Sequence, residues 1–115
     1  MKICMIGSGY VGLVSGACFS DLGNIVTCVD INKEIISKLN KGIIPIYEPG
    51  LNELVARNSK QKRLFFSNDI SNSIKKSDVI FICVGTPTKN NKAVLKYVFE
   101  VVKNIIFNLN KYKII

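Results

Sequence analysis

The sequence predicts an α/β fold with a doubly wound parallel sheet. Short apolar runs rich in Val and Ile alternate with segments whose apolar residues repeat at helical spacing. The 115 residues, 48% of them apolar and 21% charged, match one globular domain and leave no room for two. Glycines follow the first apolar run directly, as they do where a strand turns into a helix. We therefore expect one open sheet with helices on both faces.

The first 30 residues predict a strand-helix-strand unit. Residues 2–6 form an apolar run bounded by glycine, typical of a buried parallel strand. Residues 11–22 repeat apolar side chains on one helical face, and Gly23 is suited to end that helix. Residues 25–30 are again apolar and β-branched. Such a unit of about 30 residues is right-handed and parallel.

The middle of the chain predicts two helices separated by an irregular segment. Asn32 is suited to cap a helix that stops at Gly42. Pro45 and Pro49 mark the irregular segment. A shorter helix is expected from residue 51 onward, because Leu and Val recur there at helical spacing.

The next part of the chain predicts two more strands. Residues 64–66 form the third strand, and Ser67 or Asp69 would cap a brief helix ending near residue 76. Residues 78–84 form the most apolar run of the sequence, which we expect to be a central strand covered on both faces. With a strand order of 3-2-1-4, this strand would lie beside the first.

The end of the chain predicts a long amphipathic helix and the start of a fifth strand. The apolar residues on one helical face are Val94, Val98, Val101, Val102, Ile105 and Leu109. Residues 113–115 begin another extended segment. We therefore expect a sheet truncated at the start of its fifth strand, and a chain that is a fragment or a truncated reading frame.

Charge and hydropathy favour no nucleic-acid partner and no membrane contact. Sixteen Lys and Arg against eight Asp and Glu give a net charge of +8. These charges are scattered, without interleaved aromatic residues or a nucleic-acid-binding motif. The longest apolar run, residues 79–84, is far shorter than the roughly 18 residues that a membrane span requires. We expect a cytoplasmic protein.

The reactive residue types exclude several chemistries. Cys4, Cys18, Cys28 and Cys83 have spacings that fit neither a zinc site nor a C-x-x-C pair. Each lies in an apolar stretch, so we expect buried, reduced thiols and no metal site. The sequence contains no histidine, which excludes catalysis based on imidazole.

A glycine-rich segment joins the first strand to the first helix. Its residues are Gly7-Ser8-Gly9-Tyr10-Val11-Gly12, a G-x-G-x-x-G in the strand-to-helix context that dinucleotide binding requires. Gly7 allows a tight turn, Gly9 lets a diphosphate approach the main chain, and Gly12 lets the helix pack closely. The diphosphate would lie against the free N–H groups at the helix start. The alternative is a glycine-rich turn without a ligand.

Asp30 ends the second strand, 18 residues after Gly12, close to where an acid binds the adenosine ribose in such units. Its negative charge would repel a 2′-phosphate, so we favour NAD over NADP as the cofactor. Lys33 lies nearby in sequence and would weaken that repulsion. The alternative role for Asp30 is a helix cap.

A second candidate segment follows the fourth strand. Its residues are Val84-Gly85-Thr86-Pro87-Thr88. In the predicted sheet, the carboxyl ends of the first and fourth strands flank the crevice that holds the ligand. Small residues there permit contact with the main chain, and threonine hydroxyls can bond phosphate or ribose. Taken by itself, the segment is also a common turn.

Five sequence blocks, in this order, resemble the amino-terminal part of UDP-glucose 6-dehydrogenase and its relatives, the nucleotide-sugar dehydrogenases. The resemblance runs from residue 1 to 115, and generic dinucleotide-binding folds lack the Tyr-Glu-Pro-Gly-Leu block. The blocks are Ile6-Gly7-Ser8-Gly9-Tyr10-Val11-Gly12-Leu13, Val29-Asp30-Ile31-Asn32, Leu39-Asn40-Lys41-Gly42, Pro45-Ile46-Tyr47-Glu48-Pro49-Gly50-Leu51 and Val84-Gly85-Thr86-Pro87-Thr88.

The resemblance implies an incomplete, Rossmann-like NAD-binding domain over residues 1–115. NAD would be bound by residues 7–12, Asp30, residues 84–88 and Tyr97 on the last helix. The family oxidises a sugar C6 hydroxyl to a carboxylate by two hydride transfers to NAD, through a thiol adduct. The block that carries its nucleophile, Gly-Gly-x-Cys-x-x-Lys-Asp, does not occur in these residues. UDP-sugar binding and turnover are therefore expected only where the missing domains are supplied.

Two positions depart from the family pattern, and the substrate stays open. Ile35 stands where members usually carry Lys or Arg, which removes a cation from the adenosine side, and Val94 stands in place of an Asp. UDP-glucose, GDP-mannose and an N-acetylated UDP-sugar are alternatives, because the discriminating pocket lies outside these residues. A truncated gene product without function is a further alternative.

Overall fold

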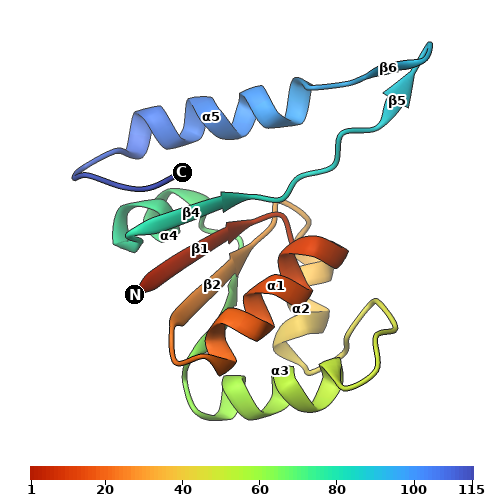
Figure 1. Ribbon diagram of the computed structural model, residues 1–115, viewed down its shortest axis with the longest axis vertical. Coiled ribbons are helices and arrows are strands. Elements are labelled where there is room, and N and C mark those ends of the chain that lie inside the picture. Colours follow the sequence, from red (N-terminus) through yellow and green to blue (C-terminus); the bar gives the residue numbers. More distant parts are fainter.

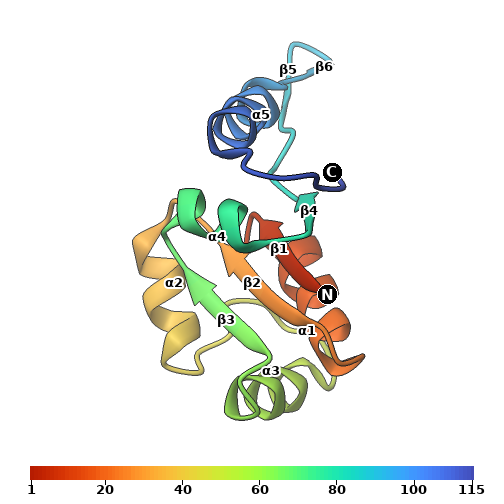
Figure 2. The same ribbon diagram turned by 90° about the vertical axis from the view of Figure 1, so that its left-hand side faces the viewer.

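The computed structural model describes residues 1–115, which form a four-stranded parallel sheet in the order β3-β2-β1-β4. Three helices cover one face of this sheet and two cover the other (Figures 1 and 2). This arrangement confirms the doubly wound α/β sheet. The strands are β1 (Lys2–Ile6), β2 (Ile25–Val29), β3 (Leu64–Ser67) and β4 (Val79–Ile82). The helices are α1 (Tyr10–Asp21), α2 (Lys33–Asn40) and α3 (Leu51–Lys60) on one face, and α4 (Ile70–Lys76) and α5 (Lys96–Asn108) on the other.

The central strand β1 explains why its sequence is apolar throughout. Ile3 and Met5 pack under α1, α2 and α3, whereas Cys4 and Ile6 pack under α4 and α5. All four side chains are buried because successive residues of a strand point to opposite faces. The strand pairs with β2 on one edge and with β4 on the other.

The predicted helix boundaries are confirmed where side chains cap them. The side chain of Asn32 accepts hydrogen bonds from the backbone N–H groups of Glu34 and Ile35 at the start of α2. Asp69, rather than Ser67, caps α4. Gly23 follows α1 with a φ of +96°, a conformation that few other residues adopt.

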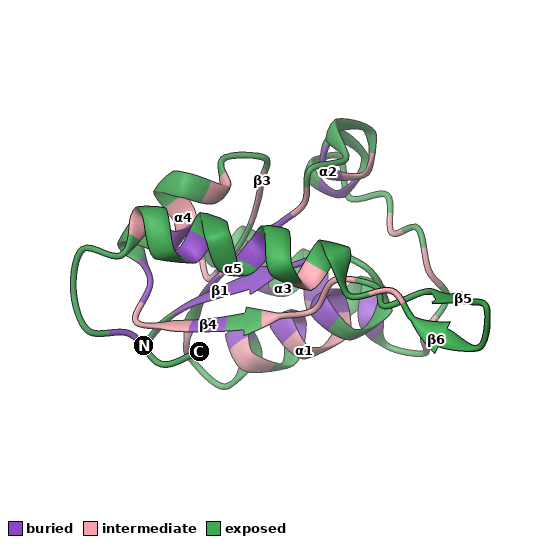
Figure 3. Cartoon of the chain, turned by 90° about the horizontal axis from the view of Figure 1, so that it is seen from above, coloured by how far each residue is buried: buried purple, intermediate pink, exposed green.

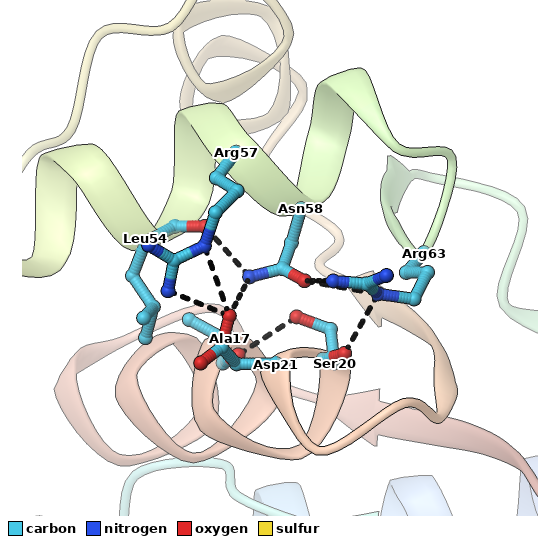
Figure 4. A network of polar contacts seen from close by, with 7 residues as sticks. All are labelled: Ala17, Ser20, Asp21, Leu54, Arg57, Asn58 and Arg63. Carbon is cyan, nitrogen blue, oxygen red and sulfur yellow. Dashed lines mark hydrogen bonds and ion pairs between the residues drawn. The ribbon is translucent and has the colours of Figure 1, made fainter.

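A polar network joins the carboxyl end of α1 to α3, at the end of α1 remote from the glycine loop (Figure 4). The carboxylate of Asp21 accepts hydrogen bonds from the Arg57 guanidinium at 2.7 Å and from the Asn58 amide at 3.0 Å. The Asn58 oxygen in turn accepts from Arg63, whose Nε also donates to the carbonyl oxygen of Ser20. Asn58 is fully buried, so the network satisfies its polar atoms without water.

The prediction that residues 78–84 form a central strand is wrong, although β4 does pack against helices on both faces, as expected. Strand β4 ends at Ile82 and lies at the edge of the sheet, where Phe81 is 36% exposed. Its outer neighbour is a single parallel bridge between Val79 and Ile114. The run is apolar because both faces carry helices, and apolar character does not distinguish an edge strand from a central one.

The expected extended segment at the chain's end is present. Ile114 accepts a hydrogen bond from the Ile80 N–H at 2.8 Å and donates to the carbonyl oxygen of Asp78 at 3.1 Å. Lys113 is buried, and its ammonium group donates to the carbonyl oxygens of Ser77 and Lys75 just after and within the last turn of α4. A cation at this end of a helix is favourable because the last carbonyls carry partial negative charge.

Helix α5 begins at Lys96, not at Val94 as predicted, because a hairpin precedes it. Its strands are β5 (Thr88–Lys89) and β6 (Lys92–Ala93), which project from the body of the molecule (Figure 1). Asn90 and Asn91 form the turn with φ values of 51° and 60°. Asn tolerates this left-handed conformation, so the Asn-Asn pair was the available signal.

The expected apolar face of α5 is only partly buried. Val101 and Ile105 pack against the sheet and Val98 is half-buried, whereas Val102 and Leu109 are exposed. The outward side of the helix is exposed along much of its length (Figure 3). The predicted amphipathic helix is present, but only part of its apolar face is buried, since a single α5 contacts the sheet along a narrow line.

Two further predictions concern the burial of the cysteines and the absence of a membrane span. Cys4 and Cys28 are buried, Cys83 is half-buried and Cys18 is exposed, and all four are free. The prediction of four buried thiols is therefore wrong for Cys18, which lies on the solvent side of α1. None of the helices combines the length and the apolar character needed to cross a lipid bilayer.

Candidate functional site

The glycine loop between β1 and α1 divides into two tightly packed glycines and one open glycine. Gly7 has a φ of +107°, and a Cβ there would lie 2.5 Å from the carbonyl oxygen of Cys83. A Cβ on Gly12 would lie 1.8 Å from the carbonyl oxygen of Gly7. A Cβ on Gly9 would meet nothing within 4 Å. The loop thus leaves open space at the one glycine expected to face a ligand.

The start of α1 has the properties of an anion site. Gly9 is the N-cap, so no side chain bonds the first N–H groups, and the first turn contains no acidic residue. The hydroxyl of Ser8 is buried without a hydrogen-bond partner in the protein. Free N–H groups and the positive end of the helix dipole favour a diphosphate at this position. These residues fit the diphosphate of a dinucleotide.

Asp30 ties the end of β2 to the glycine loop. Its Oδ2 accepts a hydrogen bond from the backbone N–H of Ser8 at 2.9 Å, and its Oδ1 accepts from the N–H of Asn32 at 2.9 Å. The helix-cap alternative for Asp30 is wrong, because Asn32 caps α2. Each carboxylate oxygen can accept more than one hydrogen bond, so the half-buried Asp30 retains acceptor capacity for a ribose diol.

A cleft of about 100 Å³ lies beside this loop, at the carboxyl ends of β1 and β2. It brings together four residues predicted from the sequence, which come from β1, β2, β4 and α5 or their ends. They are Gly7, Asp30, Val84 and Tyr97. The carboxyl edge of a parallel sheet, where the strand order reverses, is the usual ligand position in such folds.

Sequence reasoning missed two polar residues of the cleft. Glu100 and Asn104 line it from α5, on the same side of the helix as Tyr97. Their spacing from Tyr97, three and seven residues, is that of one helical face, and this was the available signal. An apolar wall formed by Ile31, Ile70 and Val101 completes the cleft.

Most of the segment after β4 lies outside the cleft. Gly85, Thr86, Pro87 and Thr88 are exposed and do not line the cleft. Thr88 pairs with Ala93 in the hairpin, and the carbonyl oxygen of Pro87 accepts from the Val94 N–H at 2.7 Å. Their proposed contact with a cofactor stays a prediction.

Ile35 has a structural reason for being apolar. It is half-buried and packs against the core beneath α2, so this position holds no cation. Lys33 at the start of the same helix is exposed. Lys33 lies two residues before Ile35, the position where members of the family usually carry Lys or Arg.

Fold and site together define the class: a Rossmann-like α/β domain with a glycine loop of the dinucleotide-binding type. Comparison with known families narrows this class. The sequence model of the UDP-glucose/GDP-mannose dehydrogenase family, NAD binding domain, matches residues 1–115. The chain therefore belongs to the UDP-glucose/GDP-mannose dehydrogenase family and corresponds to its NAD binding domain.

Individual relatives and solved structures agree with this assignment. The chain is 53% identical over 115 residues to UDP-glucose 6-dehydrogenase TuaD of Bacillus subtilis, covering 99% of this chain and 25% of the relative. It is 50% identical over 117 residues to UDP-glucose 6-dehydrogenase of Rhizobium meliloti, covering 100% of this chain and 27% of the relative. A ternary complex of GDP-mannose dehydrogenase from Pseudomonas aeruginosa superposes with a TM-score of 0.90 at 40% identity, over 94% of this chain and 25% of that one.

The likeness in shape extends to a relative of lower identity. UDP-D-ManNAc dehydrogenase from Pyrococcus horikoshii superposes with a TM-score of 0.92 at 27% identity, over 98% of this chain and 27% of that one. The chain thus spans about a quarter of the length of the relatives that it matches.

Proposed function

We propose that this chain binds NAD as the cofactor-binding domain of a UDP-glucose 6-dehydrogenase. The observation that carries the proposal is the bond between the Asp30 carboxylate and the Ser8 N–H, beside the open backbone at Gly9. It supports the proposal because the carboxylate that would accept from ribose hydroxyls lies against the loop that would hold the diphosphate. When bound, NAD supplies the acceptor for hydride.

Different groups of residues would bind the different parts of NAD. The N–H groups of residues 9–12 and the Ser8 hydroxyl would hold the diphosphate, and Asp30 would accept from the adenosine ribose. Tyr97, with Val84, would flank the adenosine half of the cofactor in the cleft. The other half of the cofactor would contact the segment that follows β4, residues Gly85, Thr86, Pro87 and Thr88.

The proposed choice of NAD over NADP depends on charge. A 2′-phosphate would approach the Asp30 carboxylate, and Glu100 adds a second negative group to the same cleft. Lys33 is exposed and would offset this repulsion only in part, because solvent screens an exposed charge.

The proposed substrate of the whole protein is UDP-glucose, oxidised to UDP-glucuronate with two NAD. Its support is the identity of about half the residues with enzymes named UDP-glucose 6-dehydrogenase. GDP-mannose or an N-acetylated UDP-sugar is the alternative, since proteins named for those substrates share the fold of this domain. We further propose that the sugar-binding and catalytic residues lie outside residues 1–115.

Calorimetric titration of the chain with NAD tests the cofactor proposal. We expect a dissociation constant below about 1 mM, equivalent to about 4 kcal/mol, and at least tenfold weaker binding of NADP. Asp30→Asn should weaken NAD binding by about tenfold or more, because a hydrogen bond to a charged group contributes about 1.5–3 kcal/mol. The same variant should narrow the difference between NAD and NADP.

A charge-matched variant separates a local effect from a general one. Glu53→Gln also removes one carboxylate, from an exposed position on α3, and should leave NAD affinity unchanged. No measurable binding of NAD by the unmodified chain at millimolar concentration would contradict the proposal. Equal affinity for NAD and NADP would contradict the role of Asp30.

A further inference from the structure

The irregular segment between α2 and α3 contacts the first residue of α1. The hydroxyl of Tyr10 donates a hydrogen bond to the carboxylate of Glu48. Tyr10 directly follows the open Gly9, and its ring is about half exposed. This hydrogen bond is the main reason that the pKa of Tyr10 is raised above its usual value. In the sequence, Glu48 stands out only as part of the Tyr-Glu-Pro-Gly-Leu block.

Glu48 is presented from a constrained stretch of chain. It is half-buried, whereas the adjoining Tyr47 and Pro49 are exposed. Its carbonyl oxygen accepts from the Leu51 N–H at 3.1 Å, and Gly50, with a φ of +81°, turns the chain into α3. Leu51 is 3% exposed and belongs to the core beneath α1. Proline at position 49 further restricts the backbone.

Two polar contacts therefore fasten α1 to the α3 side of the molecule, one near each end of α1. The Asp21–Arg57 pair lies at the carboxyl end of α1 (Figure 4). The Tyr10–Glu48 bond lies at the amino end, where the free N–H groups are. The first contact is remote from the glycine loop, whereas the second adjoins it.

The position of the Tyr10 ring matters because of what lies next to it. An exposed tyrosine without a partner exchanges among its staggered rotamers. Tyr10 is the first residue of α1, so its ring is attached at the turn where a diphosphate would bind. The hydrogen bond restricts the ring to the rotamer that reaches Glu48.

We propose that Glu48 is a positioning residue of the dinucleotide site, which holds the Tyr10 ring toward the segment of residues 43–50. The first turn of α1 then stays accessible to the diphosphate. This inference rests on the proposed function, because it concerns the same cofactor. Glu48 itself contacts no reacting atom and acts through Tyr10.

The expected size of the effect follows from population arithmetic. The apparent dissociation constant equals the intrinsic value divided by the fraction of molecules that can bind. Loss of an ordinary hydrogen bond changes the equilibrium constant between the ring positions by about threefold to tenfold, and the fraction that can bind falls by at most that factor. Glu48→Ala should therefore weaken NAD binding by more than about twofold and by at most about tenfold.

Five variants of the chain, titrated calorimetrically with NAD, test the inference. Tyr10→Phe should weaken binding as much as Glu48→Ala, and the double variant should be no weaker than either, because both remove one interaction. Glu48→Gln keeps an oxygen acceptor for Tyr10 and should stay within about twofold of the unmodified chain. Tyr112→Phe, at an exposed position, is the matched control and should change nothing.

Tyrosine emission provides a readout that is independent of NAD. The chain has four Tyr and no Trp, so its fluorescence comes from tyrosine alone. A carboxylate that accepts from a tyrosine hydroxyl quenches that emission. Glu48→Ala should raise the emission of the chain and should not raise it when Tyr10 is already Phe.

The outcomes distinguish this inference from the cofactor proposal. If the unmodified chain does not bind NAD, the proposed function fails, and the role of Glu48 fails with it. If the chain binds NAD but Glu48→Ala binds equally well, only the role of Glu48 is overturned. Tighter binding by both Glu48→Ala and Glu48→Gln would also overturn it, because removal of negative charge would then be the dominant effect.

Discussion

At the scale of single residues, the glycines of the first βα unit serve different physical purposes. Gly7 and Gly12 are required by backbone packing, whereas Gly9 is required only if a ligand approaches. Gly16, which no motif marks, is as constrained as the motif glycines. A Cβ there would lie 2.7 Å from the Sγ of the fully buried Cys28 and 3.3 Å from Met5.

Gly16→Ala should therefore destabilise the protein, although alanine favours a helix over glycine. We expect the free energy of unfolding to fall by about 1–2 kcal/mol, the usual cost of overpacking a core. Urea denaturation followed by circular dichroism measures it. The double variant Gly16→Ala and Cys28→Ala removes the contacting sulfur and should recover part of the loss. Additive losses in the double variant would contradict this explanation.

At the scale of elements, two exposed carboxylates connect parts of the chain that are distant in sequence. Asp21 joins α1 to α3, and hydrogen bonds from Asn58 and Arg57 lower its pKa. Asp78, just before β4, pairs with Lys111 at 2.5 Å, and hydrogen bonds from Lys111 and from the Lys2 N–H lower its pKa. Both contacts therefore require an ionised carboxylate.

Acid should weaken both connections. Because each folded-state pKa lies below the unfolded value of 3.8, the stabilisation is present above that value and is lost as the pH falls through the folded pKa. We expect Asp21→Asn and Asp78→Asn to be less stable than the unmodified chain at pH 7. Each difference should shrink as the pH approaches 3, as measured by urea denaturation at several pH values. A difference that stays constant over this range would count against the ionised contacts.

At the scale of the whole molecule, the chain is a cofactor-binding domain that spans about a quarter of its relatives' length. Its cleft contains Asp30 and Tyr97, which we propose to bind a dinucleotide. Burial raises the pKa of Cys28 and of Cys83, which keeps them as neutral thiols. We propose that the nucleophile of the oxidation lies outside these 115 residues.

Incubation of the chain with UDP-glucose and NAD should consequently produce no NADH, measured as absorbance, while NAD binding is retained. A full-length UDP-glucose 6-dehydrogenase under the same conditions is the positive control. NADH formation at a comparable rate would show that the 115 residues contain a complete active site, contrary to the proposal.

The order of elements and the glycine loop could be predicted because both depend on local patterns. Alternation of apolar runs defined the four strands, and Asn32 and Gly23 set helix ends by chemistry contained within a few residues. The strand order 3-2-1-4, with β4 beside β1, is confirmed. That β4 is an edge strand could not be predicted from its apolar run, because an edge strand and a central strand have the same apolar sequence when helices cover both faces. The start of α5 was misplaced because a short hairpin used residues that also fit a helical period.

The fold class, the family and the expected proximity of Asp30 to the glycine loop follow from the amino-acid sequence, since strand, turn and helix signals are short in range. Which side chains meet across the chain depends instead on tertiary packing. Tyr10 and Glu48 lie 38 residues apart, and Asp78 and Lys111 lie 33 apart. No local pattern encodes such contacts, because they arise when separately formed helices and strands pack on one sheet and bring distant side chains together.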